Sequence, residues 1–170
     1  MYSKLNQRLF RRQSTGLLAT TVILIMSDKY IKFEIVTPER VVLKEEITQI
    51  TIPTKAGEIT VLPNHIPLVS SLMPGVVHIK KKNGEDEIIS ISGGFLEVLK
   101  DKVVILADTA ERAEELDLSR AEEAHKRAAE LKEKARRGEN IDFTEVNAAI
   151  ERELARTKAV KRWRKLKNIE

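Results

Sequence analysis

The spacing of apolar residues changes part way along the chain, and this change limits the folds that are open to it. Ile31, Phe33 and Ile35 alternate with charged residues, which is the period-two pattern of a half-buried strand. Beyond Ser119 the apolar residues recur three and four positions apart, which is typical of one packed helix face. The sequence therefore predicts strands first and helices afterwards, an order that favours an α+β fold.

Short apolar runs continue the strand pattern as far as Leu106, separated by turn-forming residues. Asn83-Gly84 lies between two of these runs and predicts a hairpin, since both residues tolerate the positive φ of a type I′ turn. Asp101-Lys102 marks a second expected reversal. We expect an antiparallel β-sandwich, and the pattern excludes a parallel α/β fold. The expected strands are 31–35, 41–43, 47–52, 59–62, 76–80, 87–92, 95–99 and 103–106.

The last third of the chain predicts two helices joined as an antiparallel hairpin. The first begins at Ser119, where Glu122 completes a capping box and Asp117 is an alternative cap. The second begins near Asp142 and continues through Trp163, after a short link at 138–141. Alanines dominate the apolar face of the first helix, and they bury little area per residue. We therefore expect a hairpin that is able to open.

Three segments follow from these patterns. Residues 1–27 form a basic leader without acids, whose apolar run at 16–25 is too short to span a bilayer. It is interpreted as upstream of a true start at Met26, or as a disordered tail, with a signal or transit peptide as alternatives. We expect a β-sandwich domain over 28–110 and a helical hairpin over 111–170.

Composition excludes several classes of function. The chain has no cysteine, so it forms no disulfide framework, thiolate metal site or cysteine nucleophile, and we expect no metal site. Low aromatic content and a net charge of zero after the leader argue against nucleic-acid binding. One local exception is the segment 156–167, which has seven basic residues and no acid and is a candidate for an acidic partner.

Two loop motifs and two arginine pairs are candidates for a site. His65 lies between prolines in a predicted surface loop, where a contact role is favoured over catalysis. Gly93-Gly94 is interpreted as a close backbone approach within a sheet. The arginine pairs, one on each predicted helix, could converge on a polyphosphate near Glu111 and Asp117, or simply pair with Glu123, Glu130 and Glu153. On spacing alone the second interpretation is favoured; the pairs are Arg120 with Arg127 and Arg152 with Arg156.

Several stretches together resemble the ε subunit of bacterial F-type ATP synthase. They are GEITVLPNHIPL at 57–68, MPG at 73–75, ISGGFLEV at 91–98 and ILAD at 105–108. The resemblance extends from about residue 28 to residue 164. It implies a non-catalytic rotor subunit whose β-sandwich lies against the γ subunit and the c-ring, on the cytoplasmic face of the cell membrane. Membrane association would then arise only through the complex.

The resemblance also implies a regulatory role for the hairpin. Extended along γ, the family's hairpin inhibits ATP hydrolysis, with its basic second helix near an acidic segment of the β subunit. Arg162 and Lys165 of the basic segment, together with His65 in the loop, are the interface residues that this implies.

Some members of the family bind ATP in the folded hairpin through a motif that this chain matches at LDLSRAEEAHKR, residues 116–127. The resemblance therefore implies ATP as a regulatory ligand, not a substrate. The residues it implies as ligands are Glu111, Leu116, Asp117, Arg120, Arg127, Arg152 and Arg156.

Bound only to the folded form, ATP would shift the hairpin away from its inhibitory state. The sequence contains no P-loop, metal triad or nucleophile–base pair, so the chain itself is expected to catalyse nothing. The alternative is a free-standing β-sandwich adaptor that uses the hairpin to bind protein or nucleic acid.

Overall fold

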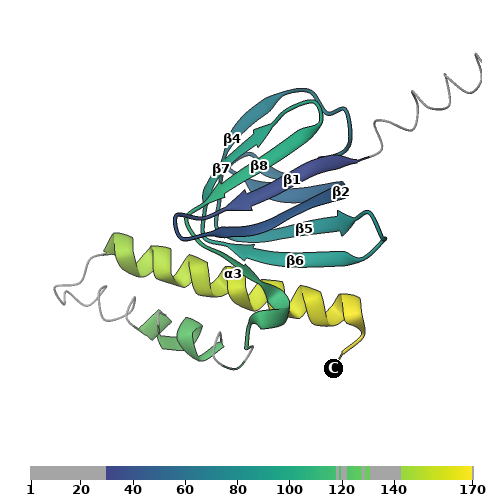
Figure 1. Cartoon of the computed structure of the whole chain (residues 1–170). Helices are drawn as coiled ribbons and strands as arrows, with labels where there is room; N and C mark the ends of the chain where they lie inside the picture. The colour runs from purple at the N-terminus through teal and green to yellow at the C-terminus, as the bar shows by residue number, and fades with distance from the viewer. Residues whose placement is uncertain (1–29, 118, 120–121, 128, 131–142, 170) are drawn as a thin grey trace, which may run out of the picture.

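The structure is a computed structural model, and it describes residues 30–117, 119, 122–127, 129–130 and 143–169. Figure 1 shows a sandwich of strands with the long helix α3 (Phe143–Lys167) lying along one side of it. The predicted α+β fold, with strands first and helices afterwards, is confirmed. The leader at 1–27 and the link at 138–141 lie outside the described residues.

Nine strands and one short 3₁₀ helix precede the hairpin in the described part of the chain. Two of the predicted strands are parts of a single long one, β2, while β4 and β9 were not predicted. The serines of β4 obscure its alternation, and β9 has only three residues. The elements are β1 (Ile31–Val36), β2 (Val41–Thr54), β3 (Gly57–Val61), β4 (Leu68–Leu72), β5 (Gly75–Lys81), β6 (Asp86–Ile91), β7 (Gly94–Val98), β8 (Lys102–Ala107), β9 (Ala110–Arg112) and η1 (Ala113–Glu115).

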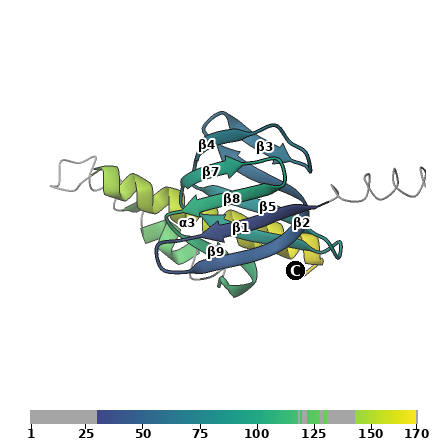
Figure 2. The same cartoon turned by 45° about the horizontal axis from the view of Figure 1, so that its top comes forward.

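The long strand β2 joins the two layers of the sandwich, which Figure 2 shows from a second angle. Its first half pairs with β1, and its second half pairs with β3 and β5. The strands run in the order β1-β8-β7-β4-β2-β5-β6-β9. One pair departs from the antiparallel prediction, because β1 and β8 run parallel, with Lys32 opposite Lys102. The two strands lie far apart in the sequence, so no hairpin turn sets their relative direction.

Aliphatic side chains fill the core between the layers. Ile35, Ile50, Ile79 and Ile105 are fully buried, and Phe33 is the only aromatic residue in this core among the described residues. Burying one such side chain contributes about 1.5–3 kcal/mol relative to leaving it exposed. The sandwich therefore has the aliphatic packing that its composition indicates.

The Asn83-Gly84 hairpin is present, but its turn differs from the prediction. β5 and β6 pair antiparallel, with Lys80 opposite Asp86. Gly84 has φ +86°, whereas Asn83 does not adopt a positive φ. The backbone N–H of Gly84 donates to the Lys81 carbonyl at 3.0 Å. The loop is therefore a three-residue connection with glycine at the left-handed position, and not a type I′ turn.

The two adjacent glycines before β7 allow a close approach of two backbones. Gly93 and Gly94 have φ +128° and +125°, backbone angles that residues with a side chain rarely adopt. A Cβ on Gly94 would lie 2.1 Å from the carbonyl oxygen of Leu106 on the neighbouring strand β8. The pair therefore lets the start of β7 and the end of β8 approach closely within the sheet, as the sequence predicted.

Gly94→Ala should destabilise the sandwich strongly, because the change adds both a steric clash and backbone strain. We expect the free energy of unfolding to fall by about 3 kcal/mol or more. Gly84→Ala is the matched control, since Gly84 shares the positive φ but has open space around it, and should cost about 1 kcal/mol. Urea denaturation followed by circular dichroism measures both. Equal losses in the two variants would contradict the role given to the Leu106 carbonyl.

Candidate functional site

Helix α3 is docked on the outer face of β5 and β6 through a small apolar patch. Val76 and Ile88 of these strands contact Ala113 and the buried Ala159 of α3, and Trp163 packs against the same group. We call these five residues the docking patch. It is much smaller than the main core, and two of its members are alanines. The free energy of docking therefore depends substantially on the polar contacts around the patch.

A salt bridge between Glu111 and Arg156 fastens α3 to the end of the sandwich. The Arg156 Nε donates to Glu111 Oε2 at 2.6 Å, and a terminal nitrogen donates to Oε1 at 2.7 Å. The other terminal nitrogen contacts Glu153 at 2.5 Å, one turn earlier on α3. The hydrogen bond from Arg156 to Glu111 raises the pKa of this guanidinium, although partial burial opposes the shift. Both carboxylate oxygens of Glu111 are engaged in this two-point contact.

The segment after η1 contains the start of the predicted nucleotide motif. Leu116 is half-buried, and Asp117 is exposed. The Asp117 carboxylate accepts the backbone N–H of Ser119 at 2.9 Å and its hydroxyl at 2.8 Å. Asp117 is therefore the residue that caps the first helix, the alternative that the sequence left open.

The predicted arginines do not all meet in the docked hairpin. Arg156 meets Glu111, whereas Arg127 is exposed and pairs with Glu123 at 3.4 Å on its own helix. Arg152 is exposed on α3, and Arg120 lies outside the described residues. Contacts of Arg127 with Glu123 and of Arg156 with Glu153 are the local pairings that spacing alone favoured.

Folding partly neutralises the basic segment 156–167. Lys161 pairs with Glu122 of the first helix at 3.0 Å. A terminal nitrogen of Arg162 lies 3.4 Å from Nδ1 of His78 on β5. Lys165 is exposed. Several cations of this segment thus face the protein itself in the docked state, while Lys165 faces solvent.

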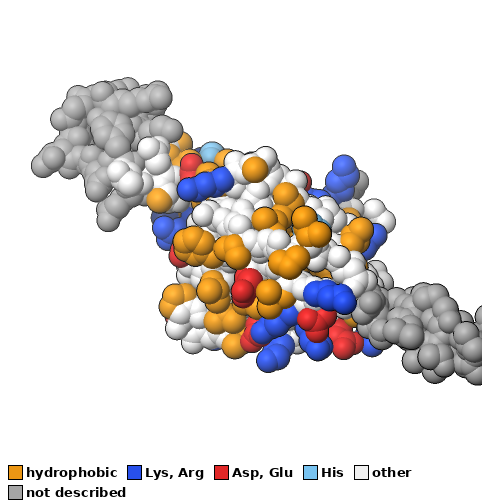
Figure 3. Space-filling view, turned by 90° about the horizontal axis from the view of Figure 1, so that it is seen from above, with side chains coloured by type: hydrophobic (Ala, Val, Ile, Leu, Met, Phe, Trp, Pro, Cys, Tyr) orange, Lys and Arg blue, Asp and Glu red, His pale blue; other side chains and the backbone are white. Residues whose placement is uncertain are grey.

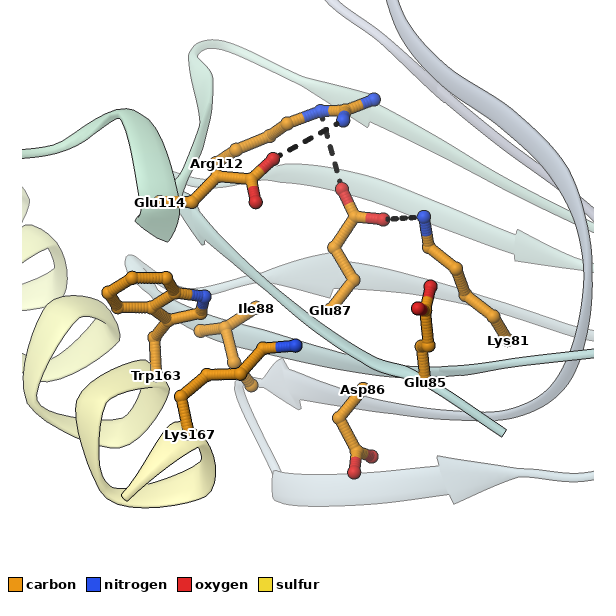
Figure 4. A pocket seen from close by; sticks show the side chains of 9 residues that line it. All are labelled: Lys81, Glu85, Asp86, Glu87, Ile88, Arg112, Glu114, Trp163 and Lys167. Atoms are coloured by element: carbon orange, nitrogen blue, oxygen red, sulfur yellow. Dashed lines mark ion pairs between the residues drawn. The ribbon is translucent and has the colours of Figure 1, made fainter. Parts of the chain in front are cut away.

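A charged pocket of about 190 Å³ lies where the end of α3 meets β6 and η1 (Figure 4). Its buried anion is Glu87, which pairs with Lys81 at 2.6 Å and with Arg112 at 3.3 Å. Burial opposes the charge on Lys81, but Glu87 and Glu45 outweigh it and raise the pKa of Lys81. In Figure 4 Trp163 and Lys167 close the pocket from α3. These ion pairs stabilise the sandwich edge under the helix, and the sequence did not predict them.

A second hollow of about 370 Å³ lies between the first helix and α3. Its lining carries both charges, from Glu122 and from Lys126 and Lys161, together with His125, Leu154 and Thr157. Among the described residues, none of those implied as ATP ligands lines this hollow.

The loop histidine is held by its own backbone. The Nδ1 of His65 donates to the Ile66 carbonyl at 2.7 Å, and the His65 backbone N–H donates to the Leu62 carbonyl. No carboxylate of the described residues pairs with the ring. The arrangement fits a surface contact residue and offers no acid partner for catalysis.

No group of three or more His, Asp or Glu side chains among the described residues could hold a metal ion. None of the helices in the described part of the chain has the length and apolar character to cross a membrane.

Comparisons with known proteins match this architecture. Residues 30–113 match the family model of the ATP synthase delta/epsilon chain β-sandwich domain. A solved chain in the Euglena gracilis mitochondrial ATP synthase (OSCP/F1/c-ring) is similar, with a TM-score of 0.66 and 26% identity. That similarity covers 75% of this chain and 79% of the Euglena chain.

Bacterial relatives extend the match into the hairpin. An ATP synthase epsilon chain of Moorella thermoacetica is 44% identical over 130 residues, which cover 76% of this chain and 95% of the relative. One from Herpetosiphon aurantiacus is 44% identical over 131 residues, covering 77% and 94%. Because these relatives are covered almost completely at this identity, the chain belongs to the ATP synthase epsilon chain family, whose members are non-catalytic subunits of the central stalk.

Proposed function

We propose that this rotor subunit links γ to the c-ring and inhibits ATP hydrolysis when its hairpin leaves the sandwich, on the cytoplasmic face of the membrane. ATP bound to the docked hairpin would stabilise this state and so reduce the inhibition of ATP hydrolysis. The observation that carries the proposal is the small docking patch, in which α3 contributes Ala159 and Trp163. Because the helix is attached through few apolar contacts, a ligand that binds only one of the two states can shift the equilibrium between docked and released hairpin.

An exposed apolar face on the sandwich supports docking against γ. We call it the γ face; it comprises Val41, Ile66, Val69, Phe95 and Leu106, which are 53%, 75%, 73%, 60% and 55% exposed. Phe95 and Leu106 are direct cross-strand partners on β7 and β8. Figure 3 looks onto the molecule from above and shows apolar side chains gathered on that side. A group of exposed apolar residues on neighbouring strands is typical of a protein interface.

The position of the γ face fits a subunit that stays bound while its hairpin moves. Its residues lie on β2, β4, β7 and β8 and, for Ile66, in the loop before β4, whereas α3 covers β5 and β6. Release of the hairpin would leave the γ face unchanged. The His65 loop precedes β4 and would extend the same contact.

Charge supports the β subunit as the partner of the released helix. In the docked state Arg156, Lys161 and Arg162 are directed to Glu111, Glu122 and His78. Release from the sandwich would free Arg156 and Arg162, and separation of the two helices would also free Lys161; together with the exposed Lys165 these cations could meet an acidic segment of β. Inhibition would then require breaking the intramolecular contacts first.

The junction between η1 and α3 supports the proposed ATP site. Leu116 and Asp117 follow η1, and Glu111 precedes it opposite Arg156. Each of the three guanidinium nitrogens of Arg156 makes one contact with a carboxylate, which uses three of its five N–H donors. A phosphate that binds Arg156 would compete with Glu111 for this guanidinium, while Arg127 and Arg152 are exposed.

Phe95→Ala should weaken binding to γ, because Phe95 has the largest side chain of the γ face and is 60% exposed. An aromatic anchor of an interface contributes about 2 kcal/mol or more, which corresponds to roughly thirtyfold in affinity. A pull-down of purified γ by the tagged chain measures the change. Leu166→Ala is the control, since Leu166 is also exposed but lies on α3. Unchanged γ binding by Phe95→Ala would contradict the assignment.

Calorimetric titration with millimolar ATP should give a binding heat for the wild-type chain. Arg127→Ala should abolish or strongly reduce it, because the change removes a guanidinium that would contact phosphate. Lys126→Ala removes the neighbouring positive charge, which lines the 370 Å³ hollow and is not implied as an ATP ligand, and this variant should bind ATP normally. The ATP proposal fails if the wild type gives no heat or if the two variants behave alike.

Glu111→Gln should strengthen inhibition at a fixed low ATP concentration. The change weakens a half-buried charged contact by about 1 kcal/mol, which shifts the docked-to-released ratio roughly fivefold toward release. ATP hydrolysis by the reconstituted complex measures the effect. Glu114→Gln is the control, because Glu114 is exposed and meets Arg112 only at 3.6 Å. Equal rates of ATP hydrolysis with both variants would contradict the role given to the salt bridge between Glu111 and Arg156.

A further inference from the structure

Three side chains in contact, those of Asp86, His78 and Arg162, connect the sandwich to α3 away from the proposed nucleotide residues. The Nε2 of His78 lies 2.7 Å from Oδ1 of Asp86 on the neighbouring strand. On the other side of the ring, Nδ1 lies 3.4 Å from a terminal nitrogen of Arg162 on α3. The side chains of His78 and Asp86 are 17% and 29% exposed, so the ring is largely enclosed.

The chemistry of the outer two groups fixes the protonation state of the ring. A carboxylate oxygen only accepts, so the Asp86 contact requires a proton on Nε2. A guanidinium only donates, so the Arg162 contact requires a lone pair on Nδ1. Both contacts exist together only when His78 is neutral. From this geometry we propose that His78, Asp86 and Arg162 form a pH-sensitive latch, which holds α3 on the sandwich while His78 is neutral and weakens when His78 is protonated.

The charged groups around His78 are consistent with weaker docking of α3 when His78 is protonated. Lys80 shares its strand and sheet face, Asp86 faces it from β6, and Arg162 faces it from α3. The residue opposite on β2 is Thr51, which is uncharged. A proton on Nδ1 would remove the hydrogen bond that Nδ1 accepts from Arg162 and would leave two cations, the imidazolium and the guanidinium, in contact. Arg162 is therefore the group that couples the protonation of His78 to helix docking.

The Asp86 contact does not oppose the effect. Asp86 and His78 both belong to the sandwich, so their attraction is present whether α3 is docked or released. Only the Arg162 contact differs between the two states. The released state therefore binds the additional proton better, and docking becomes less favourable as the pH falls and His78 becomes protonated.

The latch concerns the docking of α3 in the isolated chain and goes beyond the proposed function. It uses neither ATP nor the catalytic subunits. It would hold even if the nucleotide proposal failed, and the two are tested by separate measurements.

Trp163 offers a direct readout, because it is the only tryptophan of the chain and packs in the docking patch. Its emission maximum in the full 170-residue chain should shift to the red between pH 7.5 and pH 5.5. Hydrogen exchange of the α3 amides should accelerate in parallel. We expect the ratio of released to docked hairpin to rise by between about two- and tenfold, the equivalent of one lost hydrogen bond.

Two variants test the assignment. His78→Gln keeps a donor for Asp86 and an acceptor for Arg162 but does not titrate, so its docking should be independent of pH. Arg162→Met removes the cation and should also abolish the pH dependence. The controls are His65→Gln and His125→Gln, which change the other two histidines of the chain and should behave like the wild type.

The latch is overturned if the wild type shows the same emission and exchange at both pH values. It is also overturned if His78→Gln retains the wild-type pH response, or if His125→Gln removes that response.

Discussion

The regulatory part of this molecule depends on a pair of strands that is covered on both faces. Val77 and Ile89 enter the main core, whereas Val76 and Ile88 face outward and lie beneath α3. Without the helix this outer face would expose apolar surface to water, so the sandwich always offers α3 a place to bind. The patch is small, and polar contacts at Glu111 and His78 determine how firmly the helix is held. A ligand or a proton is therefore able to shift the equilibrium between docked and released α3.

The same cations serve the docked state and the proposed inhibitory one. Arg156, Lys161 and Arg162 contact the protein itself when α3 is docked. An acidic partner of the released helix must compete with those internal contacts for each of them. The strength of inhibition would then depend on the difference between two sets of charge pairs, and not on the number of positive charges alone. Weakening one internal pair changes that difference without altering the surface offered to the partner.

Much of the fold could be predicted from the sequence, because alternation and helical spacing are local patterns. The core positions of β1 and the close approach at Gly94 followed from such patterns. The contact between Glu111 and Arg156 joins residues 45 positions apart and depends on the register of docking, which local spacing does not specify. A clue to the docking face was present, since adjacent apolar pairs at Val76-Val77 and Ile88-Ile89 replace strict alternation where both faces are covered.

The parallel pairing of β1 with β8 has a consequence for the order in which a newly synthesised chain acquires its structure. β1 leaves the ribosome early but bonds to β8, which is translated some seventy residues later, opposite Lys102. The sandwich therefore cannot close before β8 has been translated, and α3 is translated after every strand on which it docks. The movable helix is thus the last of the described elements to be synthesised, and the pairing of β1 with β8 does not require it.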